Sequence, residues 1–141
     1  MKTTTGLRQR LIAEHHLEFG NFRFYPNIMV CEFTEGIHVS KGNALETIQL
    51  AQKVFGDEIP FISISNRLNS YSIDPVGYGE VATVFPNFRG MAIVSQSKYR
   101  QMLNALQKYF FKKPIGLFHT LEGAFVWSYE LLEKETYPEV A

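Results

Sequence analysis

The feature that most constrains this chain is a strand–helix–strand–helix pattern over residues 90–132. Residues 91–94 and 115–118 are short apolar runs with the length of buried strands. Between them, residues 98–111 place apolar side chains at helical spacing along one face. Two short apolar runs that flank one amphipathic helix predict a βαβ unit, and its two strands must be parallel because a crossover separates them. A further amphipathic helix is predicted over residues 121–132.

The chain before this unit predicts an antiparallel meander. Apolar residues alternate with polar ones from about residue 15 to residue 33, which is strand spacing. Gly20-Asn21 is expected as a two-residue hairpin turn, and Pro26-Asn27 as a second turn. The pattern leaves open whether residues 13–25 form one bent strand or two. Residues 37–39 would follow as a short extended segment.

One helix and one central strand are predicted between residues 40 and 64. The helix is expected to begin near Ser40 or Asn43, because both residue types cap helix N-termini. Its expected end is Gly56, where a residue with positive φ is wanted. The run 59–64 is rich in β-branched and aromatic side chains and predicts a buried strand.

A second helix is predicted over residues 76–85. Asp74 is its expected N-cap, and Pro75 follows at the first helical position, where proline is favoured. Gly77 and Gly79 fall inside this helix, and each costs roughly 1 kcal/mol relative to alanine there. Such a cost suggests that close approach to a neighbour, or adjustment of the helix, is needed at these positions.

Length and composition favour one α/β domain. With 141 residues and 45% hydrophobic side chains, the chain can bury a core without metals or disulfides. We predict a single domain over residues 13–133, in which about four helices cover a mixed sheet made of an N-terminal antiparallel hairpin or meander and parallel βαβ units. Residues 1–12 are expected as a flexible arm and residues 134–141 as an acidic tail. No secretory signal or long apolar segment is recognisable, so a cytoplasmic protein is expected.

Charge and motif content argue against several function classes. Fourteen basic side chains balance fourteen acidic ones, so no overall field recruits nucleic acid or an anionic membrane. His15 and His16 are adjacent and would point to opposite faces of a strand, and no metal-ligand spacing, cofactor motif or nucleophile elbow is present. Cys31 lies in an apolar run and is expected as a small buried hydrophobe rather than a reactive thiol. We therefore expect neither an enzyme nor a bound cofactor.

The polar segment over residues 65–72, which follows the predicted strand 59–64, is the best candidate for a binding site. In open α/β sheets, ligands bind beyond the carboxyl ends of the strands. A phosphate on Ser70 or Ser72 would lie near the N-terminus of the helix predicted over residues 76–85. Helix N-termini favour anions, although the carboxylate of Asp74 would repel a phosphate there. The alternative is an ordinary polar connection. The candidate residues for partner binding or a phospho-switch, chosen by location, are Asn66, Asn69, Ser70, Tyr71, Ser72 and Asp74.

The predicted helix over residues 98–111 and its flanks offer a second candidate surface. From residue 89 to residue 113 the sequence has six positive side chains and no acidic one. Such a face could attract phosphate groups, and the alternative is a solvated helix face whose last lysines complement the helix dipole. The candidate residues for an anion-facing surface are Lys98, Arg100, Lys108 and Lys112.

Five short sequence motifs carry a resemblance to a known family. They are Val39-Ser40 before the first helix, Ile59-Pro60-Phe61-Ile62-Ser63-Ile64, Ala92-Ile93-Val94-Ser95-Gln96-Ser97 with Arg100 and Asn104, Lys113-Pro114-Ile115-Gly116-Leu117-Phe118, and Leu121-Glu122-Gly123-Ala124-Phe125-Val126-Trp127. Together they resemble the STAS-like family (SpoIIAA-like, anti-sigma-factor-antagonist-like), including its stand-alone bacterial members, over residues 17–133. The resemblance implies a mixed sheet covered by helices and a regulatory interaction domain without chemistry of its own. Relatives that act as phospho-switches carry an Asp-Ser-Ser/Thr-Gly phrase after the central strand, and residues 65–72 depart from it.

Three functional hypotheses follow. The first is a non-enzymatic regulatory domain that binds a protein partner, or a second copy of itself, through the loop 66–74 and the following helix. The second is a carrier or sensor of a small amphipathic or lipid-like ligand, suggested by twelve phenylalanines, seven tyrosines and the basic helix. The third is a small enzyme whose site is assembled from residues distant in the sequence, which would need a concave pocket with at least two titratable groups.

Overall fold

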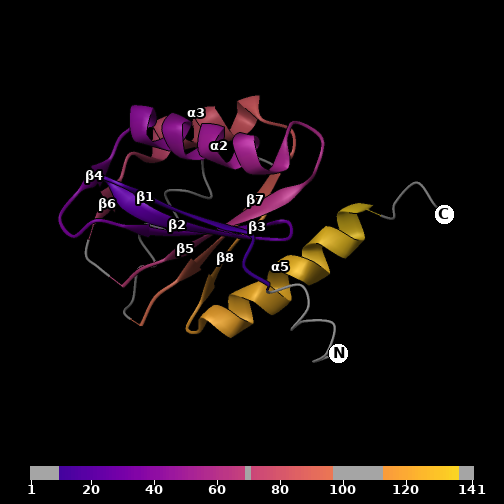
Figure 1. Ribbon diagram of the computed structural model, residues 1–141. Helices are drawn as coiled ribbons and strands as arrows, with labels where there is room; N and C mark the ends of the chain where they lie inside the picture. The colour runs from indigo at the N-terminus through magenta and orange to yellow at the C-terminus, as the bar shows by residue number, and fades with distance from the viewer. Residues whose placement is uncertain (1–9, 69–70, 97–112, 137–141) are drawn as a thin grey trace.

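A six-stranded mixed sheet with helices on both faces forms the body of the molecule. The computed structural model describes residues 10–68, 71–96 and 113–136. The strand order is β1-β2-β3-β5-β7-β8, with α2 and α3 on one face and α5 on the other (Figure 1). The strands of this sheet are β1 (Ala13–Leu17), β2 (Gly20–Tyr25), β3 (Ile28–Phe33), β5 (Phe61–Asn66), β7 (Phe88–Val94) and β8 (Ile115–Phe118). This architecture confirms the predicted α/β class with a mixed sheet.

The N-terminal meander is confirmed, but its first turn is not where the sequence suggested. Residues 13–25 form two strands, and Leu17 pairs with Gly20, so Glu18 and Phe19 make the turn. The prediction of a turn at Gly20-Asn21 was wrong because Gly20 lies inside the sheet. A Cβ atom at Gly20 would come within 2.9 Å of the Glu32 carbonyl oxygen, so a glycine is required there for strand packing.

The second turn, at Pro26-Asn27, is confirmed. Asn27 has φ of 63°, in the left-handed region that asparagine tolerates better than most residues. Its side-chain amide donates a hydrogen bond to the Pro60 carbonyl at 2.8 Å. The turn that reverses the chain between β2 and β3 is thereby tied to the start of β5.

Strands β3, β5, β7 and β8 are parallel neighbours. The parallel pairing of β7 with β8 confirms the two strands of the predicted βαβ unit, and its helix, predicted over residues 98–111, lies outside the described residues. Strand β5 starts two positions later than predicted, at Phe61, because Pro60 has no N–H group to donate to a neighbouring strand. Ile59 is left 48% exposed.

Alternation along β5 divides the core in two. Phe61 faces α2 (Lys41–Phe55) and α3 (Pro75–Val84), whereas Ile62 and Ile64 face α5 (Leu121–Thr136). On the first face the rings of Phe55, Phe61 and Phe88 stack in series with centroids 5.3 Å apart. The aromatic excess in the sequence thus fills a packed core, which removes one argument for an internal ligand cavity.

Helices α2 and α3 have the expected caps. Ser40 caps α2, and a reciprocal pair of hydrogen bonds joins it to Asn43, so Asn43 is the third residue of the helix and not its cap. Gly56 ends α2 with φ of 78°, as predicted. Asp74 caps α3, with Pro75 at its first position, also as predicted.

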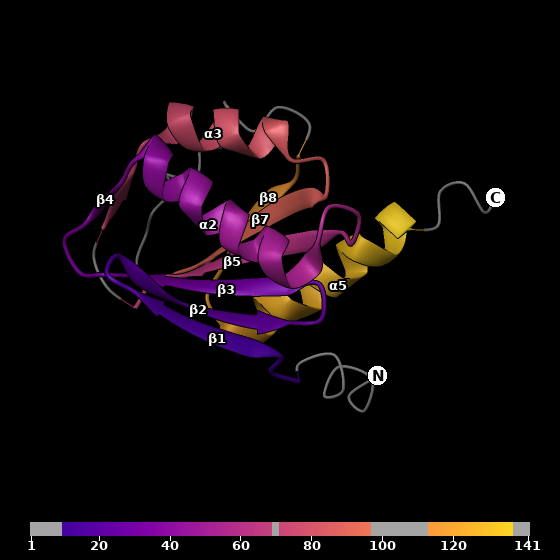
Figure 2. The ribbon, with the colours of Figure 1, turned by 45° about the horizontal axis from the view of Figure 1, so that its top comes forward.

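Helix α5 crosses the opposite face of the sheet (Figure 2). The Tyr129 hydroxyl donates to the Pro26 carbonyl at 3.0 Å, and the Phe125 ring meets Tyr25 edge-on at 5.2 Å. These contacts tie the end of the chain to the N-terminal meander. The helix continues beyond Glu133 to Thr136, into the stretch expected as an acidic tail. Among the described residues, the structure thus has three helices.

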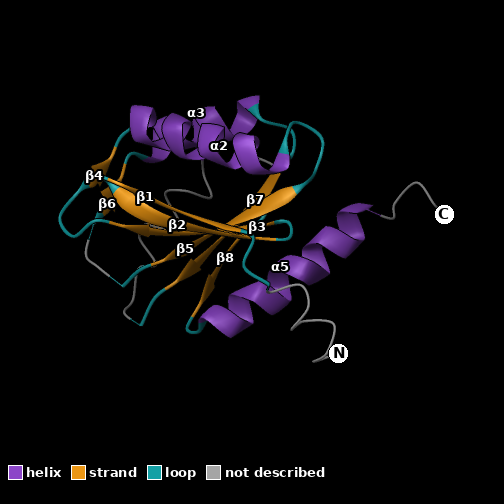
Figure 3. Ribbon diagram, viewed as in Figure 1, coloured by secondary structure: helices purple, strands orange, loops and turns teal. Residues whose placement is uncertain are grey.

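A second, two-stranded sheet lies beside helices α2 and α3 (Figure 3). It joins β4 (His38–Val39) in parallel to β6 (Ser72–Ile73). Ser72 N–H donates to the Ile37 carbonyl, and Asp74 N–H donates to the Val39 carbonyl. This pairing holds the loop after β5 against the segment before α2.

Candidate functional site

The loop 66–74 leaves the carboxyl end of β5, runs through β6 and enters α3. Arg67 holds its first part in place. The Arg67 N–H donates to the Val94 carbonyl at 2.9 Å, and its guanidinium donates to the Tyr71 carbonyl at 2.5 Å. The guanidinium carbon also lies 3.9 Å from the centre of the Tyr71 ring. Because Arg67 is only 9% exposed, it acts as an internal brace of the loop.

Tyr71 anchors the loop in the core. Its ring lies 5.1 Å from that of Phe33, and its hydroxyl is hydrogen-bonded to Ser65. Burial raises the pKa of Tyr71 to about 12. The phenol therefore stays protonated at neutral pH, and its role in the described structure is to fix the backbone between β5 and β6.

Asn66 belongs to a partly buried polar cluster on the other face of the sheet. Arg23 donates two hydrogen bonds to Glu32, at 3.1 and 2.8 Å, and Asn66 donates to the same carboxylate at 3.0 Å. Glu32 and Arg23 were not predicted as site residues. The available signal was a lone carboxylate at the end of an otherwise apolar run, since such a group needs a partner when it is buried.

Ser72 and Asp74 lie at the far end of the loop. Ser72 is exposed, and its hydroxyl is 2.7 Å from Nδ1 of His38. Asp74 accepts a hydrogen bond from the Gly77 N–H at 3.2 Å, so its carboxylate occupies the N-terminus of α3, where an incoming anion would otherwise bind. Asn69 and Ser70 lie outside the described residues.

Three apolar side chains around this loop face solvent. Leu68 is 69% exposed, and on α3 Val76 and Val84 are 43% and 69% exposed. The two valines are eight positions apart, with Glu80 midway, so they share the outward face of the helix. Leu68 on the loop and the two valines on α3 thus offer apolar contacts, and Arg67 and Tyr71 hold the described part of the loop in place.

The other residues considered in the sequence are the candidate anion-facing set, Cys31, and the adjacent histidines. The candidate anion-facing residues Lys98, Arg100, Lys108 and Lys112 lie outside the described residues. Cys31 is fully buried, and burial raises its thiol pKa to about 12, which matches the expected small hydrophobe. His15 packs edge-on against Phe24, while His16 bonds to Asn21 on the other side of β1.

Two negative observations apply to the described part of the chain. It contains no group of three or more His, Cys, Asp or Glu side chains placed to hold a metal ion. None of its helices is long and apolar enough to cross a membrane.

The fold is SpoIIAA-like, with a mixed sheet and helices on both of its faces. A solved structure of this kind is that of an uncharacterized DUF3478-family protein with a SpoIIAA-like fold from Shewanella loihica PV-4. The match has a TM-score of 0.50 and 9% sequence identity, and covers 84% of this chain and 92% of that one. No family model and no curated protein matches the sequence. The predicted STAS-like fold is therefore confirmed at the level of structure.

Proposed function

We propose that this chain is a non-enzymatic regulatory domain that binds a protein partner through the loop 66–74 and α3. The observation that carries the proposal is the exposed apolar set Leu68, Val76 and Val84. Leu68 lies at the start of the loop, and Val76 and Val84 lie near the two ends of one face of α3. Exposed apolar side chains of this kind supply the anchors of contact surfaces.

The way the loop is held supports this function. Arg67 and Tyr71 are tied to each other, and the Tyr71 hydroxyl is tied to Ser65 in the core. A rigid surface loses less conformational entropy on binding than a mobile one. Leu68 can therefore act as a preformed anchor, in the manner of the few side chains that dominate interface energies.

Three of the titratable groups near the loop, Tyr71, Cys31 and Asp74, support a role without chemistry. Burial raises the pKa of Tyr71 and of Cys31 to about 12, far from the range in which an acid–base catalyst or a thiolate nucleophile operates at neutral pH. Asp74 is committed to capping α3.

Site-specific photo-crosslinking tests the proposal. The photoreactive residue p-benzoyl-phenylalanine replaces Leu68 or Val84 in living cells, and Val126 on α5 serves as the matched control because it is 41% exposed on the opposite face. We expect one discrete adduct from positions 68 and 84 and none from position 126. An adduct of twice the chain's own mass would identify the partner as a second copy. Equal labelling from all three positions, or no adduct at 68 and 84, would contradict the proposal.

A further inference from the structure

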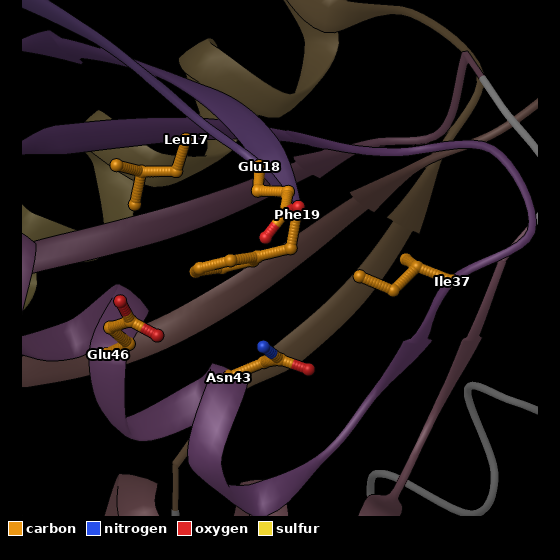
Figure 4. A pocket seen from close by; sticks show the side chains of 6 residues that line it. All are labelled: Leu17, Glu18, Phe19, Ile37, Asn43 and Glu46. Atoms are coloured by element: carbon orange, nitrogen blue, oxygen red, sulfur yellow. The ribbon is translucent and has the colours of Figure 1, made fainter.

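A pocket of about 400 Å³ lies at the end of the molecule where the β1–β2 turn meets the start of α2 (Figure 4). We name it the Phe19 pocket, and its volume is within the range of sites that hold small ligands or single side chains. Three separate segments build it, so no local motif in the sequence predicts it. Its lining residues are Leu17, Glu18, Phe19, Ile37, Asn43 and Glu46.

The walls of the Phe19 pocket are fixed by backbone hydrogen bonds. Thr34 N–H donates to the Phe19 carbonyl at 3.1 Å, and its hydroxyl donates to the Glu18 carbonyl at 3.1 Å. Ile37 N–H in turn donates to the Thr34 carbonyl at 3.2 Å. The β1–β2 turn and the segment before β4 are thus joined, and the pocket is formed before any ligand arrives.

The floor of the pocket is aromatic and aliphatic. The ring of Phe19 stacks on Phe33 with centroids 6.4 Å apart and meets Phe22 edge-on at 5.6 Å. Leu17 and Ile37 are half-buried beside it. Such a floor favours a ligand with an apolar or flat face.

The rim of the pocket carries two exposed carboxylates. Figure 4 shows the Glu18 and Glu46 side chains on either side of the Phe19 ring. Within the described residues neither carboxylate forms an ion pair. The nearby cation of α2, Lys41, is paired with Glu80 at 3.0 Å.

Asn43 completes the rim with a fixed amide. Its side-chain oxygen accepts hydrogen bonds from the N–H and the hydroxyl of Ser40 at 3.2 and 3.0 Å. The amide is therefore held at the N-terminus of α2, and the acceptors left for a ligand are the carboxylate oxygens of Glu18 and Glu46.

We propose that the Phe19 pocket binds an arginine side chain from a protein partner. An arginine has an apolar stem, a flat guanidinium that stacks on an aromatic ring, and paired donors that match a carboxylate. A lysine ammonium is more strongly hydrated and lacks the flat face, so it fits the Phe19 floor less well. The partner requirement rests on the proposed function, whereas the pocket can be tested by itself.

The pocket and the described part of the loop 66–74 are linked through the core and the backbone. Phe33 contacts both Phe19 and Tyr71, and the Ile37 carbonyl accepts the Ser72 N–H. A partner seated on Leu68 could therefore extend an arginine into the Phe19 pocket across β4 and β6.

The test is a titration with N-acetyl-arginine amide, followed by the backbone amide NMR signals of Phe19, Ile37 and Asn43. We expect saturable shifts at these residues with a dissociation constant on the order of 1 mM, as for other ligands of this size. The uncharged isostere N-acetyl-citrulline amide and N-acetyl-lysine amide should each bind about tenfold more weakly. Equal binding of citrulline would overturn the role of charge, and equal binding of lysine would overturn the arginine assignment.

Matched double variants separate the pocket from general electrostatics. Glu18→Gln with Glu46→Gln should weaken binding of the arginine probe about tenfold. Glu122→Gln with Glu130→Gln changes the net charge equally on the exposed side of α5 and should leave binding unchanged. Equal weakening in both variants, or the absence of saturable shifts in the native chain, would refute the pocket. Leu68→Ser should not affect the probe, so the two proposals fail separately.

Discussion

Replacing Gly77 with alanine tests how closely α3 packs on α2. A Cβ atom built at Gly77 would lie 2.7 Å from the Lys41 Cβ, 3.1 Å from the Lys41 Cα and 2.7 Å from an Asp74 carboxylate oxygen. Two of these atoms belong to the backbone or the first side-chain carbon of α2. They cannot turn away as the end of a flexible side chain would, so the two helices must separate.

Two opposing effects set the size of the change. Overpacking a well-packed contact costs about 1–3 kcal/mol, while replacing glycine by alanine inside a helix contributes roughly 1 kcal/mol of stability. Because the contacts are with the Cα and Cβ atoms of Lys41, the upper part of the overpacking range, about 2–3 kcal/mol, applies, and Gly77→Ala should lower the free energy of unfolding by about 1–2 kcal/mol in total. For a chain of this length the melting temperature should fall by about 3–6 °C.

The assay is urea unfolding followed by circular dichroism, with Gly42→Ala as the matched control. A Cβ atom at Gly42 in α2 would have its nearest neighbour, the Ser40 hydroxyl, at 3.7 Å. This substitution should therefore stabilise the chain by about 0.5 kcal/mol. If Gly77→Ala is as stable as the native chain, or more stable, the close approach of α2 and α3 is not a packing constraint and the reasoning fails.

Three further predictions concern side chains that are buried or partly buried. Burial, with a smaller contribution from Arg89, lowers the pKa of Lys113 to about 8 from its ordinary 10.5. The unfolded chain therefore binds more protons between these values, and the free energy of unfolding should gain a rising component from pH 8 to pH 9 that Lys113→Met lacks; equal slopes would refute this. Because Cys31 is fully buried, a thiol reagent should label it only at the rate of unfolding, and rapid labelling of the native chain would contradict the buried position. Glu32→Ala leaves Arg23 without its carboxylate and should cost about 2 kcal/mol in urea unfolding, whereas a loss below about 0.5 kcal/mol would show that solvent already satisfies Arg23.

Much of the fold could be predicted because its signals are local. Two adjacent residues, Asp74 and Pro75, are enough to mark the start of α3. The dipeptide Pro26-Asn27 marks a turn through the backbone preferences of its own two residues. Period-two alternation likewise identified the strands of the meander. Each of these signals depends on neighbours in sequence, so it survives whatever the rest of the chain does.

The candidate site was predicted only in outline. The sequence placed the candidate site after β5. It did not reveal that the Arg67 guanidinium packs on the Tyr71 ring, or that Asn66 donates a hydrogen bond to Glu32 on the opposite face of the sheet. These contacts join residues whose neighbours in the chain carry no shared pattern. The Phe19 pocket was missed for the same reason, since its walls come from three separate segments.

The sequence by itself determined which stretches become strands and helices and where most of them begin. Only the tertiary structure decided that Gly20 is a strand residue packed against the Glu32 carbonyl, that β4 pairs with β6, and that Glu18 and Glu46 line one pocket with Phe19. The physical reason is that propensities and caps act over a few bonds, whereas register and pockets depend on which backbones and side chains come within contact distance after the sheet has formed.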